Sequence, residues 1–465
     1  MSGDQHDPRA DTFEEVLGET SALAGRWLDG VREGSIPPRA GIDEVKDALG
    51  RSLPARGDDA IAVLRRLADA VEPGLMRMDS PRFYGWVIGG TQPVSLGADW
   101  LVSSWDQNAA MRAVTPGVVA AEELAGGWLV DLLGLPPSAE VGFVTGATTA
   151  NAVGMIAGRD EVLRRAGWDA RTDGLAGGPR VRFIAGQERH ISVDDAGRYA
   201  GLGVPAVVAS DAQGRIRVDA LRDALAEGSG PALVCLQAGN VHSGAFDDFA
   251  AAIAVAHDAG AWVHVDGAFG LWAAVTPGLS HLTAGMAGAD SWATDAHKTL
   301  NVPYDSGIAI VADPTALYSA FTQQAAYLAA SADVGDPSQR VLELSRRARG
   351  VPVWAALARL GRDGVADLVQ TLADGAAALA AGLRTVPGVS ILNDVVYTQV
   401  CVAFGDDETT RAVAAAVDAS GTAYGSPSQW QGRAVLRFSV SNWLTSPDDV
   451  ERTVEVVREA IGRRS

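Results

Sequence analysis

Cysteine and basic charge are both scarce in this sequence of 465 residues. It has only two cysteines, Cys235 and Cys401, and each lies within an apolar stretch. That pattern is typical of buried thiols in a reducing compartment, and it argues against a disulfide framework or a zinc site. Lysine and arginine total 38 against 57 aspartates and glutamates, a formal net charge of −19. Because such a chain repels nucleic acid and anionic membranes, we expect neither as a partner.

Long apolar runs are missing as well. No uninterrupted stretch is long enough to cross a bilayer, and the acidic opening "MSGDQHDPRADTFEEV" has no apolar core of the kind that a secretory signal needs. We therefore expect a cytoplasmic protein without membrane attachment. A chain of this length can form a large core with one or two appended units.

The apolar pattern divides the chain into three parts. Residues 1–79 predict a helical arm, because apolar residues recur at helical spacing from Phe13 to Val31 and again near 59–71. In residues 80–353, short apolar runs alternate with Ala-rich helical patterns, which predicts a mostly parallel sheet covered by helices on both faces. Residues 354–465 predict a smaller α+β domain with strands "VSILN", "TQVCVAF" and "AVLRFSV".

Seven runs of the middle part are predicted to be strands of the large sheet. They are "EVGFVTG", "VRFIAG", "PAVVAS", "ALVCLQAG", "AWVHVD", "DSWATD" and "GIAIVAD". The run "DSWATD" leads into "AHKTLNVPYDSG", which places Lys298 directly after a run that is predicted to be buried. Burial penalises the ammonium and favours the neutral amine, which is a nucleophile. The alternative is that Lys298 reaches the surface where the strand ends.

Three other stretches carry groups that suit a phosphorylated aromatic ligand. In "AWVHVDGAFG" a strand ends at Asp266, whose carboxylate could hold a proton on a heterocyclic nitrogen or simply cap a turn. In "GFVTGATTANAVGMIAG" a glycine turn and two threonines open a helix, whose start could bind phosphate. The stretch lacks both the dinucleotide glycine pattern and the Walker lysine. In "AGQERHISVDDAG" the ring of His190 could cover a flat cofactor or serve only structure.

In this order, the phosphate turn, the histidine, the aspartate and the His-Lys pair resemble the group II pyridoxal-phosphate-dependent decarboxylases, the aromatic-amino-acid and glutamate decarboxylase family. The resemblance runs from Pro81 to Trp443, and "VHVDGAFG" and "DAHK" are its most specific parts. It implies an α/β protein of fold type I, like aspartate aminotransferase. It also implies pyridoxal 5'-phosphate as cofactor, no metal, and an amino acid as substrate.

Roles for the cofactor site follow from this resemblance. Lys298 would carry the cofactor, Asp266 would pair with its ring nitrogen, His190 would stack on the ring, and Ala268 would pack beneath it.

The resemblance also assigns residues near the phosphate. Ala147, Thr148 and Thr149 would cradle it, and His297 would help to hold cofactor or substrate. Asp295 stands near the phosphate where many relatives have Asn.

Further roles are less closely tied to a motif. Asn240 would lie near the cofactor hydroxyl, and Tyr327, on a loop, would return a proton after carbon dioxide leaves. Arg346 and Arg347 match a basic patch that approaches the cofactor or the partner subunit, or is simply solvated. The stretch that should form the substrate pocket spells out neither an aromatic nor a glutamate pocket; its candidate residues are Trp86, Trp105, Asn108 and Arg112.

We therefore expect decarboxylation of an L-amino acid, with aromatic substrates slightly preferred. The alternatives are another reaction of the same fold, namely a lyase, an aldehyde synthase or a transaminase, and a non-catalytic dimer. Tyr327 and His190 argue against aldehyde formation, and the pair of Asp266 and Lys298 argues against a non-catalytic fold. The family also implies a homodimer with a shared active site, in which the N-terminal helices wrap around the partner.

Overall fold

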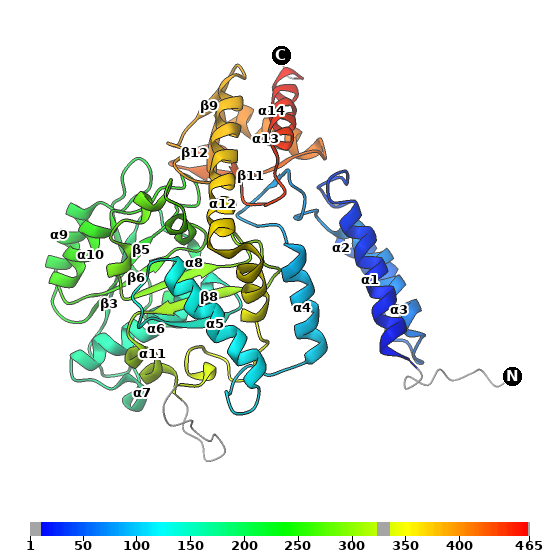
Figure 1. Cartoon of the computed structure of the whole chain (residues 1–465). Coiled ribbons are helices and arrows are strands. Elements are labelled where there is room, and N and C mark those ends of the chain that lie inside the picture. Colours follow the sequence, from blue (N-terminus) through cyan, green and yellow to red (C-terminus); the bar gives the residue numbers. More distant parts are fainter. Residues whose placement is uncertain (1–10, 323–334, 464–465) are drawn as a thin grey trace.

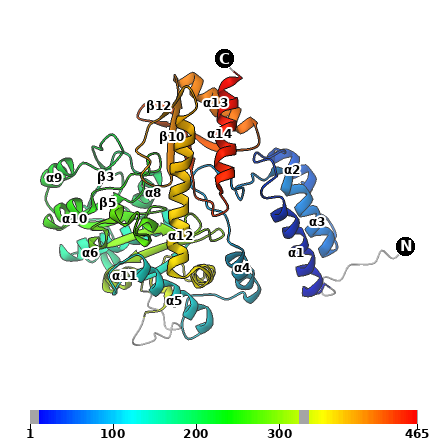
Figure 2. The ribbon, with the colours of Figure 1, turned by 45° about the horizontal axis from the view of Figure 1, so that its top comes forward.

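The computed structural model describes residues 11–322 and 335–463. Figure 1 shows a large body of strands and helices, a smaller sheet with helices beside it, and three N-terminal helices that lie apart from both. The same separation is visible after the turn in Figure 2. Within the described residues, no helix has the length and apolar character needed to span a membrane.

The large body is built on a seven-stranded sheet in the order β2-β8-β7-β6-β5-β3-β4. Its strands are β2 (Glu140–Val144), β3 (Arg182–Gly186), β4 (Ala206–Val208), β5 (Ala232–Gln237), β6 (Trp262–Asp266), β7 (Ser291–Asp295) and β8 (Gly307–Val311). Only β8 runs antiparallel to its neighbours. Each strand falls within one of the seven predicted runs, so the mostly parallel sheet is confirmed.

Both faces of this sheet are buried. Along β6, Val263 and Val265 belong to one apolar cluster, whereas Trp262 belongs to a second cluster on the other face. The helices of this part are α4 (Pro93–Trp105), α5 (Pro116–Leu132), α6 (Ala147–Arg165), α7 (Ala170–Asp173), α8 (Ile191–Tyr199), α9 (Val218–Ala226), α10 (Phe249–Asp258) and α11 (Pro314–Phe321). Short 3-10 turns are η2 (Glu72–Gly74), η3 (Leu271–Val275), η4 (Ser280–Thr283), η5 (Met286–Gly288) and η6 (Pro337–Gln339). A sheet buried on both faces explains the nearly continuous apolar runs of its strands.

The smaller part has a five-stranded sheet in the order β1-β11-β12-β10-β9. Its elements are β1 (Phe83–Tyr84), β9 (Val389–Ile391), β10 (Gln399–Phe404), β11 (Tyr424–Trp430), β12 (Arg433–Ser439), α12 (Gly350–Arg384), α13 (Asp407–Ala419) and α14 (Pro447–Gly462). β1 pairs in parallel with β11, and α12 bends at Gly361, where φ is +62°. The smaller part therefore contains β1 from before the large sheet and α12, which begins at Gly350. The predicted divisions at residues 79 and 353 stay predictions.

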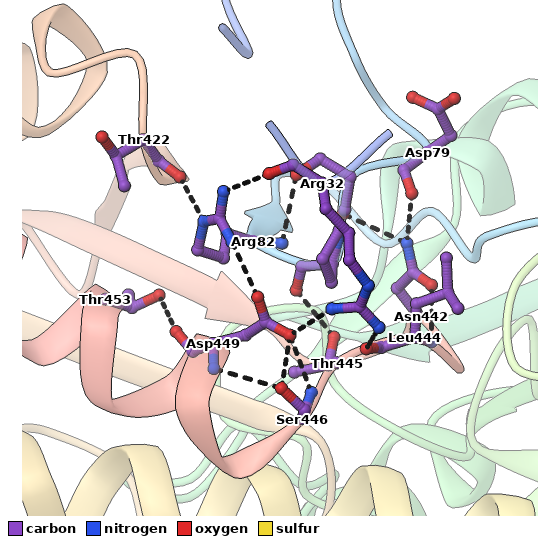
Figure 3. Close-up of polar contacts among 12 residues, drawn as sticks. Arg32, Asp79, Arg82, Thr422, Asn442, Leu444, Thr445, Ser446, Asp449 and Thr453 are labelled. Atoms are coloured by element: carbon purple, nitrogen blue, oxygen red, sulfur yellow. Dashed lines mark hydrogen bonds and ion pairs between the residues drawn. The ribbon is translucent and has the colours of Figure 1, made fainter. Parts of the chain in front are cut away.

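A buried carboxylate ties the N-terminal segments to the smaller part (Figure 3). Oδ1 of Asp449 accepts a hydrogen bond from Nη1 of Arg82 at 2.8 Å, and its Oδ2 accepts one from Nη1 of Arg32 at 3.1 Å. Asp449 also forms the capping box of α14 with Ser446. Arg32 follows the arm helix α1 (Phe13–Asp29), which is joined by α2 (Ile42–Leu49) and α3 (Ala60–Val71). This Asp449 cluster therefore anchors the base of the arm and the segment before β1.

Replacing Asp449 by Asn should destabilise the protein. The change leaves the mostly buried guanidinium of Arg82 without its counter-charge, so we expect the free energy of unfolding at pH 7 to fall by roughly 2–3 kcal/mol. Asp448→Asn, an exposed change in the same first turn of α14, is the matched control and should change stability by less than about 0.5 kcal/mol. Urea unfolding of both variants measures the difference.

The effect of Asp449 should also depend on pH. Burial by itself raises the pKa of Asp449, but hydrogen bonds from Ser446 and Arg82 outweigh burial and hold the pKa below its usual 3.8. The stabilisation is therefore fully present above pH 3.8 and is lost as the pH falls through the lower pKa of the folded state. A stability difference that stays constant from pH 7 to pH 3 would contradict this account.

Candidate active site

Three elements of the large sheet meet around one cavity. β6 ends at Asp266, β7 ends at Asp295, and the turn after β2 leads through Gly146 into α6. These ends lie at one edge of the sheet, the edge at which open α/β sheets bind their ligands. The cavity has a volume of about 370 Å³. The residues predicted from the sequence that line this cavity are Ala147, Thr148, His190, Asp266, Ala268, Asp295, His297 and Lys298.

Lys298 and Asp295 form an ion pair in this cavity. Nζ of Lys298 lies 2.8 Å from Oδ2 of Asp295, and the two side chains are 19% and 3% exposed. The other carboxylate oxygen, Oδ1, is buried and has no hydrogen-bond partner among the described residues. The alternative interpretation of the sequence, in which Lys298 reaches the surface where the strand ends, is therefore not what the structure shows.

The start of α6 faces the same cavity. Ala147 and Thr148 line it, and the N–H groups of a first helical turn have no partner within the helix. Together with the positive end of the helix dipole they can bind an anion. The hydroxyl of Thr149 instead lies 2.9 Å from Oγ1 of Thr145, and Thr149 is not among the lining residues. Its contact with phosphate stays a prediction.

His190 and Asp266 also face the cavity. His190 is the N-cap of α8, and its Nδ1 accepts a hydrogen bond from the N–H of Ser192 at 3.2 Å. Loss of hydration lowers the pKa of His190 and outweighs the opposing charge of Asp266, so the ring is neutral at pH 7. Asp266 is buried, and its Oδ1 accepts from the N–H of Ala268 at 3.2 Å.

Tyr304 is a cavity residue that the sequence analysis missed. Its ring stacks on His297 with centroids 4.1 Å apart. Although 56% of Tyr304 is exposed, desolvation of its hydroxyl raises the pKa of Tyr304 to about 12. Burial lowers the pKa of His297, so at pH 7 both rings are neutral. Tyr304 stands six positions after Lys298 in the same motif, and this proximity was the available signal.

Arg437 is the second missed residue. It lies on β12 of the smaller part, lines the cavity and is buried, and burial lowers its pKa to about 10. Among the described residues no carboxylate lies within ion-pair distance of it, and its Nε has no hydrogen-bond partner. A single arginine inside the apolar run "AVLRFSV" was the signal. Of the four candidate pocket residues, Trp86 lines this cavity, whereas Trp105, Asn108 and Arg112 do not.

Several predicted residues lie elsewhere. The amide of Asn240 bonds to backbone groups of Glu188, His242 and Ser243, and Asn240 does not line the cavity. Tyr327 lies outside the described residues.

The two predicted arginines are used in ion pairs. Arg346 pairs with Glu122, at 2.6 Å between Nη2 and Oε2, in a buried position. Arg347 pairs with Asp99 at 2.7 Å. Since neither lines the cavity, a contact of either one with the cofactor has no support in this geometry.

Comparison with known proteins identifies the family. Residues 43–404, more than half of the chain, match the pyridoxal-dependent decarboxylase conserved domain. The chain belongs to this family. Pyridoxal phosphate is accordingly its cofactor, and it is an enzyme of the group II decarboxylases with fold type I.

Two relatives and a solved structure agree with the assignment of this chain to the decarboxylase family. It is 25% identical to tryptophan decarboxylase 1 of Oryza sativa subsp. japonica, over 97% of this chain and 94% of the relative. It is 23% identical to 4-hydroxyphenylacetaldehyde synthase of Rhodiola rosea, over 95% and 90%. A crystal structure of Oryza sativa TDC with PLP and tryptamine superposes with a TM-score of 0.92 at 22% identity, covering 99% of this chain and all of the other.

The cavity of the decarboxylase fits the cofactor chemically. It combines an amine, a carboxylate at a strand end and a helix start, which suit an aldehyde, a ring nitrogen and a phosphate respectively. Polar atoms around it, Oδ1 of Asp295 and Nε of Arg437, are buried without a partner among the described residues. Such atoms are uncommon in a folded protein unless a ligand or water completes them.

Gly89 allows the segment after β1 to pack against the lysine. A Cβ atom at this position would lie 2.1 Å from the carbonyl oxygen of Lys298 and 2.9 Å from that of His297. Both contacts are with backbone, so Gly89→Ala must separate the segment after β1 from the backbone of Lys298 and disturb the packing that positions the lysine. We expect a cofactor content at least about threefold lower in the purified protein, measured by visible absorbance, because small shifts of a catalytic group are costly.

Gly97→Ala serves as the control for this prediction. Gly97 lies in α4 with nothing within 4 Å of an added Cβ, so the change should leave the cofactor content intact. Full cofactor occupancy in Gly89→Ala would show that the close approach does not position Lys298.

Proposed function

We propose that the protein decarboxylates an L-amino acid to its amine and carbon dioxide, with aromatic amino acids preferred. The observation that carries this proposal is the meeting of Lys298, Asp266 and the start of α6 in one cavity. Family membership supports a decarboxylase, and the choice of substrate class is ours.

In the proposed reaction each residue has a defined task. Bound pyridoxal phosphate supplies an electron sink for the bond that breaks. Lys298 holds it through its amine, Asp266 keeps a proton at the ring nitrogen, and His190 covers one face of the ring. The start of α6 binds the phosphate. Tyr327 is proposed to return a proton to the substrate's α-carbon.

The walls of the cavity support an aromatic substrate. Trp86, Val87, Ile88 and Val241 give it an apolar side, and the ring of Tyr304 adds a flat surface next to Lys298. Flat aromatic faces favour aromatic partners in offset or edge-on contact. The similarity to a tryptophan decarboxylase points in the same direction.

We also propose that two copies of the chain assemble and share the active site. Phe13 at the start of the arm is 87% exposed, and Leu124 on α5 is 53% exposed. Leu124 borders a second cavity, of about 660 Å³, together with Trp105, Val114 and Trp354. Large apolar areas of this kind usually mark an interface.

A cytoplasmic location is likewise part of the proposal. Cys235 and Cys401 are both free and buried, which is typical of a reducing compartment. Cell fractionation with detection of the native chain tests it, and recovery from a secreted fraction would contradict it.

A product screen tests the reaction. Purified protein with added pyridoxal phosphate should convert an aromatic L-amino acid to amine and carbon dioxide in equal amounts, without hydrogen peroxide. Lys298→Ala should lower the rate at least about a thousandfold, because the nucleophile is lost. Tyr327→Phe should lower it by about 10²–10⁴-fold.

Other outcomes of the screen have definite meanings. Peroxide together with aldehyde would favour an aldehyde synthase, as in the relative from Rhodiola rosea. Turnover without carbon dioxide would replace decarboxylation by another lyase or transaminase reaction. An unchanged rate in Tyr327→Phe would remove Tyr327 from the proposal.

A charge placed on α5 tests the assembly. We expect Leu124→Glu to shift sedimentation from dimer to monomer, because a buried carboxylate without a partner opposes association. Val204→Glu, which alters an apolar side chain that is 80% exposed outside this area, should sediment as the unaltered protein does. A wild-type monomer at micromolar concentration would refute the proposed dimer.

A further inference from the structure

The sequence contains only two lysines, Lys298 and Lys46. Lys46 lies exposed on α2, far from the cavity in sequence and in environment. Lys298 instead faces the cavity, with its amine held against a carboxylate at 2.8 Å. The two lysines therefore differ both in exposure and in the carboxylate held next to Nζ of Lys298.

The charged groups around Lys298 come from several elements. Neutral rings belong to His190, His297 and Tyr304, as their shifted pKa values indicate. Arg437 on β12 is a cation, and Asp266 on β6 is an anion whose Oδ1 is engaged by the N–H of Ala268. Among the described residues, Asp295 is the only carboxylate within 4 Å of Nζ.

The position of the Asp295 carboxylate is fixed by its surroundings. Its backbone N–H donates to the carbonyl of Ala268 at 2.9 Å, and Asp295 is paired with Gly307 across β7 and β8. Oδ2 faces Lys298 and, at 3.5 Å, Nε2 of His297. Oδ1 points toward the start of α6, since a Cβ at Gly146 would lie 3.7 Å from it. The backbone contacts fix Asp295 at the end of a buried strand, and they place its carboxylate beside Nζ of Lys298.

Attachment of the cofactor leaves the positive charge on the nitrogen of Lys298 that lies next to the carboxylate of Asp295. An ammonium and an aldehyde combine to form a carbon–nitrogen double bond, the carbonyl bond breaks, and one water leaves. The three hydrogens of the ammonium become one on the linking nitrogen and two in the water, so one positive charge remains at that nitrogen. A fixed carboxylate 2.8 Å from Nζ stabilises this charge before and after attachment.

We propose that Asp295 sets the protonation state at Lys298. It holds the amine as an ammonium in the cofactor-free protein and holds a proton on the nitrogen that links Lys298 to the cofactor. This role rests on the proposed function of Lys298 as the attachment point. It gives Asp295 a task other than phosphate contact.

Competitive acetylation of the cofactor-free protein tests the first half. An amine reacts with acetic anhydride only in its neutral form, and mass spectrometry of the two lysine-containing peptides gives the ratio of Lys298 to Lys46 labelling under limiting reagent. Because Asp295→Asn removes the charge and keeps the volume, we expect the ratio to rise by about tenfold or more. Asp367→Asn, an exposed change on α12, should leave the ratio unchanged.

Wild-type protein gives the same information without a variant. At pH 7, Lys298 should be labelled more slowly than Lys46, because its amine is paired with a carboxylate. Equal labelling of the two lysines would overturn the proposal even if Asp295→Asn failed to fold.

The visible spectrum of the cofactor-loaded protein tests the second half. The pH midpoint of the absorbance change of the linked cofactor should fall by about one unit or more in Asp295→Asn. An unchanged midpoint together with an unchanged labelling ratio would overturn the proposal. Borohydride reduction and peptide mapping separate this result from failure of the proposed function: a cofactor attached elsewhere than Lys298 refutes the function, while the labelling ratio still reports on the ion pair.

Discussion

The site depends on the register between the strands that carry its two aspartates. Asp266 at the end of β6 lies opposite Ala293, so β7 continues for two more residues and ends at Asp295. The chain then turns and returns Lys298 over that carboxylate. Because side chains alternate along a strand, a shift of one residue would turn Asp295 to the opposite face and remove the ion pair. The buried pair in turn requires the apolar layers that cover both faces of the sheet.

Glycine at two positions allows the surrounding segments to approach this pair. A Cβ at Gly307, the partner of Asp295 on β8, would lie 2.5 Å from the backbone of Gly146. The start of α6 can therefore reach the strand end only because position 307 has no side chain. Gly89 allows the segment after β1 a similar approach to Lys298. Backbone packing thus brings the anion-binding N–H groups of α6 and the amine of Lys298 to the same cavity, with the carboxylate of Asp295 between them.

Much of this arrangement could be predicted from sequence, and the exceptions share a cause. The strands of the large sheet are apolar runs because both faces are buried, which makes them recognisable locally. β11 escaped notice since "YGSPSQW" has glycine, proline and serines typical of turns, and it becomes a strand only through its pairing with β12. The same holds for the site. Lys298, Asp266 and His190 lie in motifs with local signals, whereas Arg437 reaches the cavity from a different sheet through contacts that no local pattern encodes.

The dependence on the smaller part has a further physical consequence. The cavity takes Arg437 from β12 and Trp86 from the segment that follows β1. The segment just before β1 is held by bonds of Asn442 to the carbonyls of Asp79 and Ser80. The Asp449 cluster anchors the same segment from its other side. A rotation of the smaller part relative to the large sheet would therefore move two walls of the cavity together. Because Gly89 lies after β1 and packs against the backbone of Lys298, the same rotation would also act on the lysine. The smaller part thus affects both the shape of the cavity, through Trp86, and the charge around the amine, through Arg437.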